Sequence, residues 1–327
     1  MKHFWDTLPR PFFALAPLED VTDAAFRRLI ARHGKPNVMF TEFTSADGLV
    51  LADEAGQKKL RKKLLYDESE RPIVAQLFSA EPEYMEKASV LVAELGFDGV
   101  DINMGCPVNE VVRQECGAAL IKNPARAREL IRAAGKSGLP VSIKTRIGYD
   151  RDELDTWLPE LLVEEPAAIT VHARTRREMS DVPARWENVA RAVEIRDSLK
   201  SRTLIIGNGD LVDIADARAK VAATGADGAM LGRAIFGNPW LFSGASNSEH
   251  SRKAVTKELK IAALIEHLKL FDEFLTGTTH FAAMKKHFKA YVSGWDGARD
   301  LRVRLMATER VGEAQTVLRQ AVRDRID

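Results

Sequence analysis

The stretch PIVAQLFSAEPEYMEKASVLVAELGFDGVDINMG (residues 72–105) contains the pattern that decides the fold. Two short apolar runs, PIVAQLF and GVDINMG, flank a segment in which apolar residues recur at helical spacing until the chain reaches Gly96. Runs of this length that are rich in Val and Ile predict buried parallel strands, and the connecting segment predicts a helix. The stretch is therefore expected to form a strand–helix–strand unit.

The same alternation recurs along roughly the first 235 residues. The other apolar runs are FFALAPL (12–18), NVMFTEF (37–43), PVSIKTRIG (140–148), AAITVHAR (167–174), TLIIGNGD (203–210) and GAMLGRA (228–234). With the two runs above they make eight, which is the number of strand–helix units in a (β/α)8 barrel. An open doubly wound sheet is the alternative, but it needs a Gly-rich phosphate turn after its first strand, and FFALAPL has none. We therefore predict an α/β protein with a TIM barrel over residues 1–243.

The sequence changes character after Trp240. Residues 243–251, SGASNSEHS, are small and polar and predict a linker. Helical periodicity resumes at Lys257, which predicts a smaller C-terminal helical domain over residues 252–327. Residues 245–327 hold 15 Lys and Arg against 11 Asp and Glu, although the net charge of the whole chain is only +1. The cations expected to form a phosphate-facing surface on this domain are Lys285, Lys286, Lys289, Arg299 and Arg302. An ordinary solvated face is the alternative.

Composition excludes several other classes of protein. No apolar run approaches 18 residues and no charged-then-apolar leader follows Met1, so a soluble cytoplasmic protein without a membrane partner is expected. The two cysteines, Cys106 and Cys116, are too few for a disulfide framework or a four-thiolate zinc site, and no metal is expected. The sequence indicates no protein partner, and a monomer is expected.

Polar residues gather where the predicted strands end, which is where barrel enzymes place their active sites. Gly209 and Gly232 follow the last two strands and permit backbone N–H groups to approach a phosphate closely, while Arg233 adds positive charge. A mononucleotide-like cofactor such as FMN fits this arrangement. Ordinary turns remain the alternative for both glycines.

Three further strand-end residues are expected to face the same cofactor. Lys144 would place a cation near the pyrimidine edge of a flavin, or else would form a buried ion pair inside the barrel. Gln76 would donate to and accept from the ring edge, or would cap a strand. His172 would lie beside the ring or the phosphate, or would be a core histidine.

Cys106 lies in a Gly-Cys-Pro turn directly after a predicted strand and is expected to face the pocket. An unperturbed thiol has a pKa of about 8.5 and is protonated at neutral pH, which makes it a competent acid. Reduction of a pyrimidine C5=C6 bond needs a hydride on one carbon, which a flavin supplies, and a proton on the other. Asn103 offers an amide for the uracil edge. A buried structural cysteine is the alternative for Cys106.

One longer segment, DINMGCPVNEVVRQECGAALIKNP (101–124), resembles the active-site segment of tRNA-dihydrouridine synthases. Other motifs align in that family's order across the barrel: APLEDVTDAAFRR (16–28), AQLF (75–78), SIKTRIG (142–148), TVHARTR (170–176), IGNGD (206–210) and DGAMLGRAIFGNPW (227–240). KKHFKAYVSGWDGARDLR (285–302) is similar, more loosely, to the family's C-terminal helical RNA-binding domain.

The resemblance implies that the protein reduces a uridine in tRNA to 5,6-dihydrouridine, with Cys106 as proton donor and NADPH as the reductant of the FMN. It also implies that Asn103 and Arg174 contact the substrate base. The residues that it implies for FMN binding are Pro17, Leu18, Glu19, Gln76, Lys144, His172, Asn208, Gly209, Asp210, Gly232 and Arg233.

The chain departs from the family pattern at two places. REMSDVPARW (177–186) stands where many bacterial members have a Gly- and Tyr-containing stretch, and Cys116 stands where small residues are usual. The first departure bears on the position of the substrate and the second on the uniqueness of the thiol. The alternative functions are a flavin barrel acting on a free pyrimidine or a dihydroorotate-like molecule, a dihydrouridine synthase acting on ribosomal RNA, and a non-catalytic RNA-binding protein.

Overall fold

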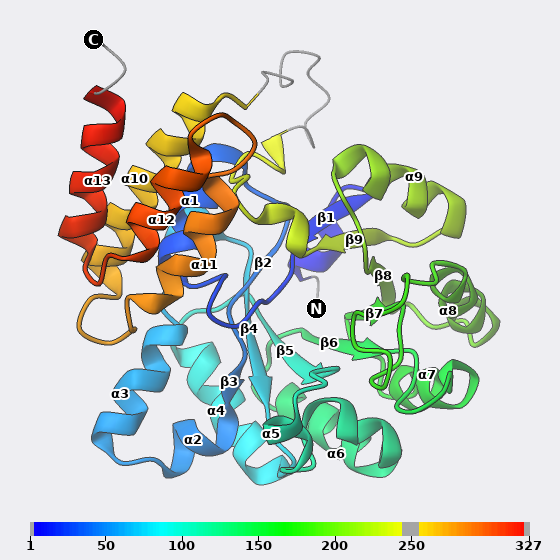
Figure 1. Ribbon diagram of the computed structural model, residues 1–327. Coiled ribbons are helices and arrows are strands. Elements are labelled where there is room, and N and C mark those ends of the chain that lie inside the picture. Colours follow the sequence, from blue (N-terminus) through cyan, green and yellow to red (C-terminus); the bar gives the residue numbers. More distant parts are fainter. Residues whose placement is uncertain (1–2, 244–254, 324–327) are drawn as a thin grey trace.

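Parallel strands form a ring at the centre of the structure, and helices pack around its outside (Figure 1). This computed structural model describes residues 3–243 and 255–323. The strands follow the order β1-β9-β8-β7-β6-β5-β4-β2, and β3 also pairs with β4. A parallel bridge between Ala14 and Val38 joins β1 to the chain entering β2, which closes the ring. The predicted (β/α)8 barrel is confirmed.

Every strand position predicted from the apolar runs is occupied. The strands are β1 (Phe12–Leu15), β2 (Met39–Phe40), β3 (Thr44–Ser45), β4 (Ile73–Phe78), β5 (Gly99–Met104), β6 (Val141–Arg146), β7 (Ala168–His172), β8 (Leu204–Asn208) and β9 (Gly228–Leu231). The second barrel position differs from the rest because it is divided between β2 and β3, both of which pair with β4.

The helices of the barrel follow the strands, and several of them begin at a side-chain cap. They are α1 (Ala24–Gly34), α2 (Ala46–Leu51), α3 (Glu54–Lys63), α4 (Pro82–Glu94), α5 (Asn109–Val112), α6 (Pro124–Gly135), α7 (Leu154–Leu162), α8 (Glu187–Ser198) and α9 (Ile214–Thr224). The Asp23 side chain accepts the Phe26 N–H at 2.9 Å and starts α1. Asp213 caps α9 in the same way, and Gly225 ends that helix in the left-handed conformation.

The interior of the barrel is apolar at one end and polar at the other. Because side chains alternate across a strand, residues two positions apart share a face. The apolar layer contains Phe12, Val74 and Met230, and Trp5 from the short helix Phe4–Thr7 packs against it. Further along the same faces stand the polar residues Gln76, Asp101, Asn103, Ser142, Lys144, Thr170, His172 and Asn208. Because of this alternation, a row of inward-facing polar side chains lies at the carboxyl end of the barrel.

In the described part of the chain four helices follow the barrel, and the first two of them pack on α1 (Figure 1). They are α10 (Lys257–Phe274), α11 (Ala282–Tyr291), α12 (Ala298–Met306) and α13 (Val311–Arg323). The predicted linker at 243–251 lies almost wholly outside the described residues, so the division into two domains stays a prediction. Within the described part of the chain, no helix is both long enough and apolar enough to span a membrane.

Two buried histidines lie where these helices meet the barrel. The ring of His267 on α10 stacks on Phe26 of α1 at 4.9 Å between centroids, and His287 on α11 contacts the same phenyl ring edge-on at 4.7 Å. Neither histidine has a hydrogen-bond partner for its ring nitrogens among the described residues. Burial lowers the pKa of His287 to about 3 and holds that of His267 well below its ordinary value. Both rings are therefore neutral in the folded protein.

This neutral pair predicts an acid-sensitive fold. The unfolded chain binds protons at these histidines near pH 6.5 while the folded chain does not, so stability is expected to fall as pH drops below about 6.5. The loss is about 1.4 kcal/mol per pH unit for each histidine. Denaturant unfolding between pH 5 and pH 8 measures it, and His287→Leu should flatten the dependence whereas His280→Leu, at an exposed position, should not. An unchanged slope in His287→Leu would contradict the assignment.

Candidate active site

A cavity of about 380 Å³ opens at the carboxyl ends of the strands. All residues that the sequence predicts for the cofactor line it, and so do Cys106, Asn103 and Arg174. The cofactor residues are Pro17, Leu18 and Glu19 after β1, Gln76 on β4, Lys144 on β6, His172 on β7, Asn208, Gly209 and Asp210 at the end of β8, and Gly232 and Arg233 after β9. The structure thus brings these residues, which are far apart in the sequence, together at one site. Their individual roles stay predictions.

Lys144 is a half-buried cation on the wall of this cavity. Its Nζ atom donates to Asn208 Oδ1 at 3.2 Å, which is the only hydrogen bond of this side chain to another described residue. The amide of Asn208 is held in turn by a 2.7 Å bond from Nδ2 to the Met230 carbonyl. Burial, reinforced by the nearby Arg146, lowers the pKa of Lys144 to about 8. The carboxylate of Asp101 acts on Lys144 through its field rather than through a direct ion pair, so the alternative of a simple buried pair receives no support.

A chain of side-chain hydrogen bonds links the barrel interior to the loop that carries Cys106. Asp101 accepts bonds from Ser142 Oγ at 2.6 Å and from Gln76 Nε2 at 2.7 Å. Gln76 Oε1 then accepts the Asn103 amide at 3.0 Å. Asn103 Oδ1 accepts the backbone N–H groups of Gly105 and Cys106, at 3.1 and 2.8 Å. Asn103 therefore holds the cysteine loop in place, while the predicted contact of its amide with the substrate base stays a prediction.

The Cys106 thiol is half-buried on the wall of the cavity. Burial raises the pKa of this thiol above its ordinary value, although Arg146 and Lys144 oppose the shift. Arg146 also braces the loop, since its Nε donates to the Gly105 carbonyl at 2.8 Å. Sequence reasoning did not assign a role to Arg146. Its position two residues after Lys144 on the inward face of β6 is the signal that points to it.

The second thiol, Cys116, does not line the cavity. It is buried at the start of the short helix Gly117–Lys122, and its Sγ lies 3.2 Å from the Gln114 carbonyl. Burial raises its pKa to about 12. A packing role for Cys116 follows, and Cys106 is the thiol that faces the site.

The turn after β8 provides the glycine and charge arrangement predicted for phosphate binding. Gly209 has a φ of 126°, and a Cβ at this position would lie 2.7 Å from that of Ala184, so only glycine fits. Asp210 next to it accepts bonds from the Arg174 and Arg233 guanidinium groups and from the Ala184 N–H. Gly232 has a negative φ, and a Cβ at this position would make ordinary van der Waals contacts with Ala16 and Leu18, at 3.6 and 3.7 Å, so the available space does not require glycine.

The Arg174 side chain makes its hydrogen bonds to other groups of the protein. Its Nε donates to the Val182 carbonyl at 2.6 Å, and its other nitrogens contact His172 Nε2 at 3.2 Å and the Asp210 carboxylate. Burial holds the pKa of His172 well below its ordinary value, and four nearby cations lower it further. His172 is therefore a neutral ring oriented by Arg174. The contact predicted between Arg174 and the substrate base stays a prediction.

Segment 177–186, which departs from the family pattern, packs directly on the site. Ser180 lines the cavity, and the Met179 carbonyl accepts Arg146 at 3.0 Å. The Trp186 indole N–H donates to the Gly209 carbonyl at 2.8 Å and so holds the turn after β8 in place. The departure therefore shapes one wall of the cavity instead of lying on a distant surface.

The five cations predicted for RNA contact lie outside the cavity. Lys286 on α11 forms an ion pair with Asp20 at 3.0 Å, so α11 faces the loop after β1 that leads into the site. Arg302 donates to the Val292 carbonyl at 2.9 Å, so the Arg302 side chain has a structural role within the helical region. Lys289 and Arg299 are exposed and Lys285 is half-buried. Phe288 and Tyr291 of the same segment turn to the core.

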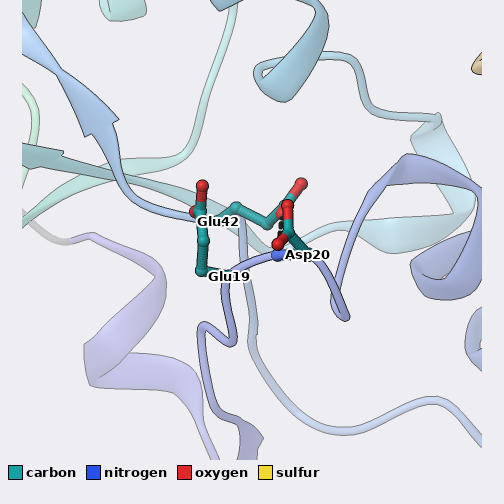
Figure 2. A group of neighbouring side chains, drawn as sticks. All are labelled: Glu19, Asp20 and Glu42. Carbon is teal, nitrogen blue, oxygen red and sulfur yellow. Dashed lines mark hydrogen bonds between the residues drawn. The ribbon is translucent and has the colours of Figure 1, made fainter. Parts of the chain in front are cut away.

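Three carboxylates gather beside the cavity, and Figure 2 shows Glu19 and Asp20 on the loop after β1 facing Glu42. Their ligand-type oxygens lie within 4.8 Å of one another. Burial, with Asp23 and Glu19 nearby, raises the pKa of Glu42 to about 7. Protein groups already partner the cluster: Lys63 pairs with Glu19, Lys286 with Asp20, and the Asp20 N–H donates to Glu42 at 2.6 Å. Contacts within the protein thus account for the arrangement.

Comparison with known sequences identifies the family. A profile described as Dihydrouridine synthase (Dus) matches residues 14–327. A Bacillus subtilis (strain 168) protein named "Probable tRNA-dihydrouridine synthase 2" is 42% identical over 328 residues, which covers 100% of this chain and 98% of that protein. A Staphylococcus epidermidis (strain ATCC 35984) protein named "Probable tRNA-dihydrouridine synthase" is 40% identical over 319 residues, or 97% of this chain and 95% of that protein.

A solved structure supports the barrel independently. The structure of histamine dehydrogenase from Rhizobium sp. 4-9 superposes with a TM-score of 0.53 and 12% sequence identity, covering 80% of this chain and 49% of that one. At this identity the likeness bears on the fold alone. The family profile, by contrast, extends across the barrel and the C-terminal helices. On the sequence matches, this chain belongs to the dihydrouridine synthase family.

Proposed function

We propose that this protein reduces the C5=C6 bond of a uridine in tRNA to give 5,6-dihydrouridine. The proposal rests on one observation. A protonated thiol, Cys106, and a cation, Lys144, line the same cavity at the carboxyl end of the barrel. Membership in the dihydrouridine synthase family gives the reaction class, and the names of the two relatives give tRNA as the RNA. We propose that the protein acts as a monomer in the cytoplasm.

Family membership points to a flavin cofactor, and the cavity residues fit FMN. Lys144 is a buried ammonium with a single neutral partner, so an electron-rich ring edge would complete its hydrogen bonding. Arg233 and the Gly209 turn stand where a phosphate would be held. The cavity volume of about 380 Å³ lies within the range of small-molecule sites. We propose FMN as the flavin and NADPH as its reductant.

A flavin held by these residues would supply the hydride for one carbon of the pyrimidine double bond. The Cys106 Sγ–H supplies the proton to the other carbon, and burial keeps this proton on sulfur at neutral pH. Asn103 and Arg146 position the thiol, because one accepts the Cys106 N–H and the other binds the Gly105 carbonyl.

A direct test uses the purified full-length protein. Its absorption spectrum should show a bound flavin, and addition of NADPH should bleach it. With NADPH and an unmodified tRNA transcript, nuclease digestion and mass spectrometry should detect dihydrouridine. Ribosomal RNA and free uracil serve as competing substrates. Absence of flavin, or faster reduction of free pyrimidine than of tRNA, would contradict the proposal.

Charge variants of the helical region test its predicted contact with RNA. Truncation is unsuitable because it would expose Phe26, which α10 and α11 cover. We expect Lys285→Gln/Lys289→Gln/Arg299→Gln to bind tRNA less tightly and to lower the dependence of log affinity on log salt by roughly two to three units, since each lost phosphate contact removes about one. Filter binding at several salt concentrations measures this. Flavin content should match the wild type, and an unchanged slope would place the RNA elsewhere.

A further inference from the structure

Helix α3 (Glu54–Lys63) is a strongly basic element on the barrel itself. Its sequence, EAGQKKLRKK, ends in five cations within six residues, and none of its residues is buried. Leu60 is the side chain that turns toward α2, where a Cβ on Gly48 would meet it at 2.6 Å. The hydrophobic core therefore does not require this helix. Most of its exposed side chains are cations.

The spacing of the charges on α3 is unfavourable for an isolated helix. Lys58 and Lys62 are four residues apart, as are Lys59 and Lys63, and like charges at this spacing repel. Lys63 pairs with Glu19, and Lys62 donates to the Thr278 hydroxyl at 3.2 Å. The side chains of Lys58, Lys59 and Arg61 make no hydrogen bond or ion pair with any described residue. These cations are therefore free to contact the phosphates of an RNA strand.

The position of α3 links it to the active site. A second cavity of about 360 Å³ lies between α3, the loop after β1 and the turn that joins α10 to α11. Glu19 lines both this cavity and the active-site cavity, so the two are adjacent. In Figure 1, α3 continues the edge formed by α10 and α11 along the rim of the barrel. Helix α3 therefore lies beside both the loop that leads into the active site and the turn between α10 and α11.

We propose that α3 is a second RNA-binding surface, formed by Lys58, Lys59 and Arg61, that contacts phosphates of the strand leading away from the uridine in the active site. This inference rests on the proposed function. Carboxylates of Glu19, Asp20, Asp23 and Glu42 line the second cavity and repel phosphate, so the RNA backbone passes over Lys58 and Arg61 and over the rim of the cavity, where Lys59 stands, rather than into it.

The chemistry of the helix favours RNA over other anionic partners. A membrane-binding helix needs a broad apolar face beside its cations, and α3 has only Leu60 and Ala55 as apolar residues. A protein interface is expected to have aromatic or apolar anchors at its centre, and α3 has no aromatic residue. Phosphate contacts need exposed cations without other anchors, which is what this helix offers.

The test compares two variants that lose the same charge. Lys58→Gln/Lys59→Gln/Arg61→Gln removes the proposed surface, whereas Lys35→Gln/Lys200→Gln/Arg202→Gln removes three exposed cations from the turns that enter β2 and β8, at the opposite end of the barrel. Binding of an unmodified tRNA transcript is measured between 50 and 300 mM salt. We expect the α3 variant to bind at least tenfold more weakly at low salt, with a slope reduced by about two to three units, while the control variant changes by less than threefold.

The outcomes separate this inference from the proposed function. If the wild type forms dihydrouridine in tRNA but the α3 variant binds with unchanged affinity and slope, α3 is not an RNA surface and the proposed function stands. If both variants weaken binding equally, the effect is one of net charge and the inference fails. If the wild type binds flavin but makes no dihydrouridine, the proposed function itself fails. Flavin content and NADPH-dependent bleaching should be equal in all three proteins.

Discussion

Replacement of Cys106 by Ala is expected to lower dihydrouridine formation by at least 100-fold while leaving flavin binding intact. The thiol lines the cavity and stays protonated at neutral pH because burial raises its pKa. Removal of a general acid costs about 10²–10⁴ in rate. Reduction of the flavin by NADPH needs neither the uracil nor this acid, so stopped-flow bleaching should proceed at the wild-type rate. The two measurements together isolate the proton-transfer step.

Cys116→Ala is the matched control, because it removes the other thiol of the chain. Cys116 is buried outside the cavity, so dihydrouridine formation should change by less than about threefold, with some loss of stability from the lost packing. Reversed phenotypes would mean that the wrong thiol has been assigned. A slow flavin reduction in Cys106→Ala would mean that the substitution disturbs the cofactor site instead of the acid.

The pH dependence offers a second test of the same assignment. An acid with a raised pKa stays protonated beyond the ordinary thiol range, so the rate of uridine reduction should not rise with pH in the neutral and mildly alkaline range and should fall at strongly alkaline pH. Single-turnover rates with pre-reduced enzyme measure it. A rate that rises with pH through this range would indicate that the thiolate is the active form.

The barrel could be predicted from the sequence because each of its strands is a short apolar run with a polar end. The same runs placed Gln76, Lys144 and His172 correctly at the carboxyl end of the barrel. Two-residue alternation explains why: Ser142, Lys144 and Arg146 share the inward face of β6. Applied to every strand, the same alternation also places Asp101 and Arg146 on inward faces. The motifs alone had indicated no role for either residue.

Other features depend on contacts between distant segments and leave no local signal. The hydrogen bonds of Arg174 to Val182 and Asp210 depend on how segment 177–186 folds back over the site. The division of the second barrel position between β2 and β3 likewise follows from pairing with β4, not from its own apolar pattern. The basic character of α3 is plain in the sequence, but its place beside the helical region is visible only in the fold.

Lys144→Met is expected to weaken flavin binding by roughly 10- to 150-fold, the cost of losing a hydrogen bond from a charged group. Met nearly matches the length of Lys and removes only the ammonium from a buried position. The flavin that remains bound should also be harder to reduce, since the cation favours negative charge on the reduced ring. Equilibrium dialysis with FMN and reductive titration of the bound flavin measure the two effects. Lys200→Met, at an exposed position far from the cavity, is the control.

The stability of the flavin-free protein distinguishes a cofactor role from a structural one. The folded pKa of Lys144 is lowered to about 8, which means that burial of the charged form costs the fold free energy at neutral pH. If Lys144 serves the cofactor, Lys144→Met without flavin should be at least as stable as the wild type, because an apolar side chain removes that cost. If Lys144 instead serves the barrel through Asp101, the substitution should destabilise the flavin-free protein by several kcal/mol, as an uncompensated buried carboxylate does. Denaturant unfolding of both flavin-free proteins decides between the two, and loss of stability together with unchanged FMN affinity would overturn the assignment of Lys144 to the flavin.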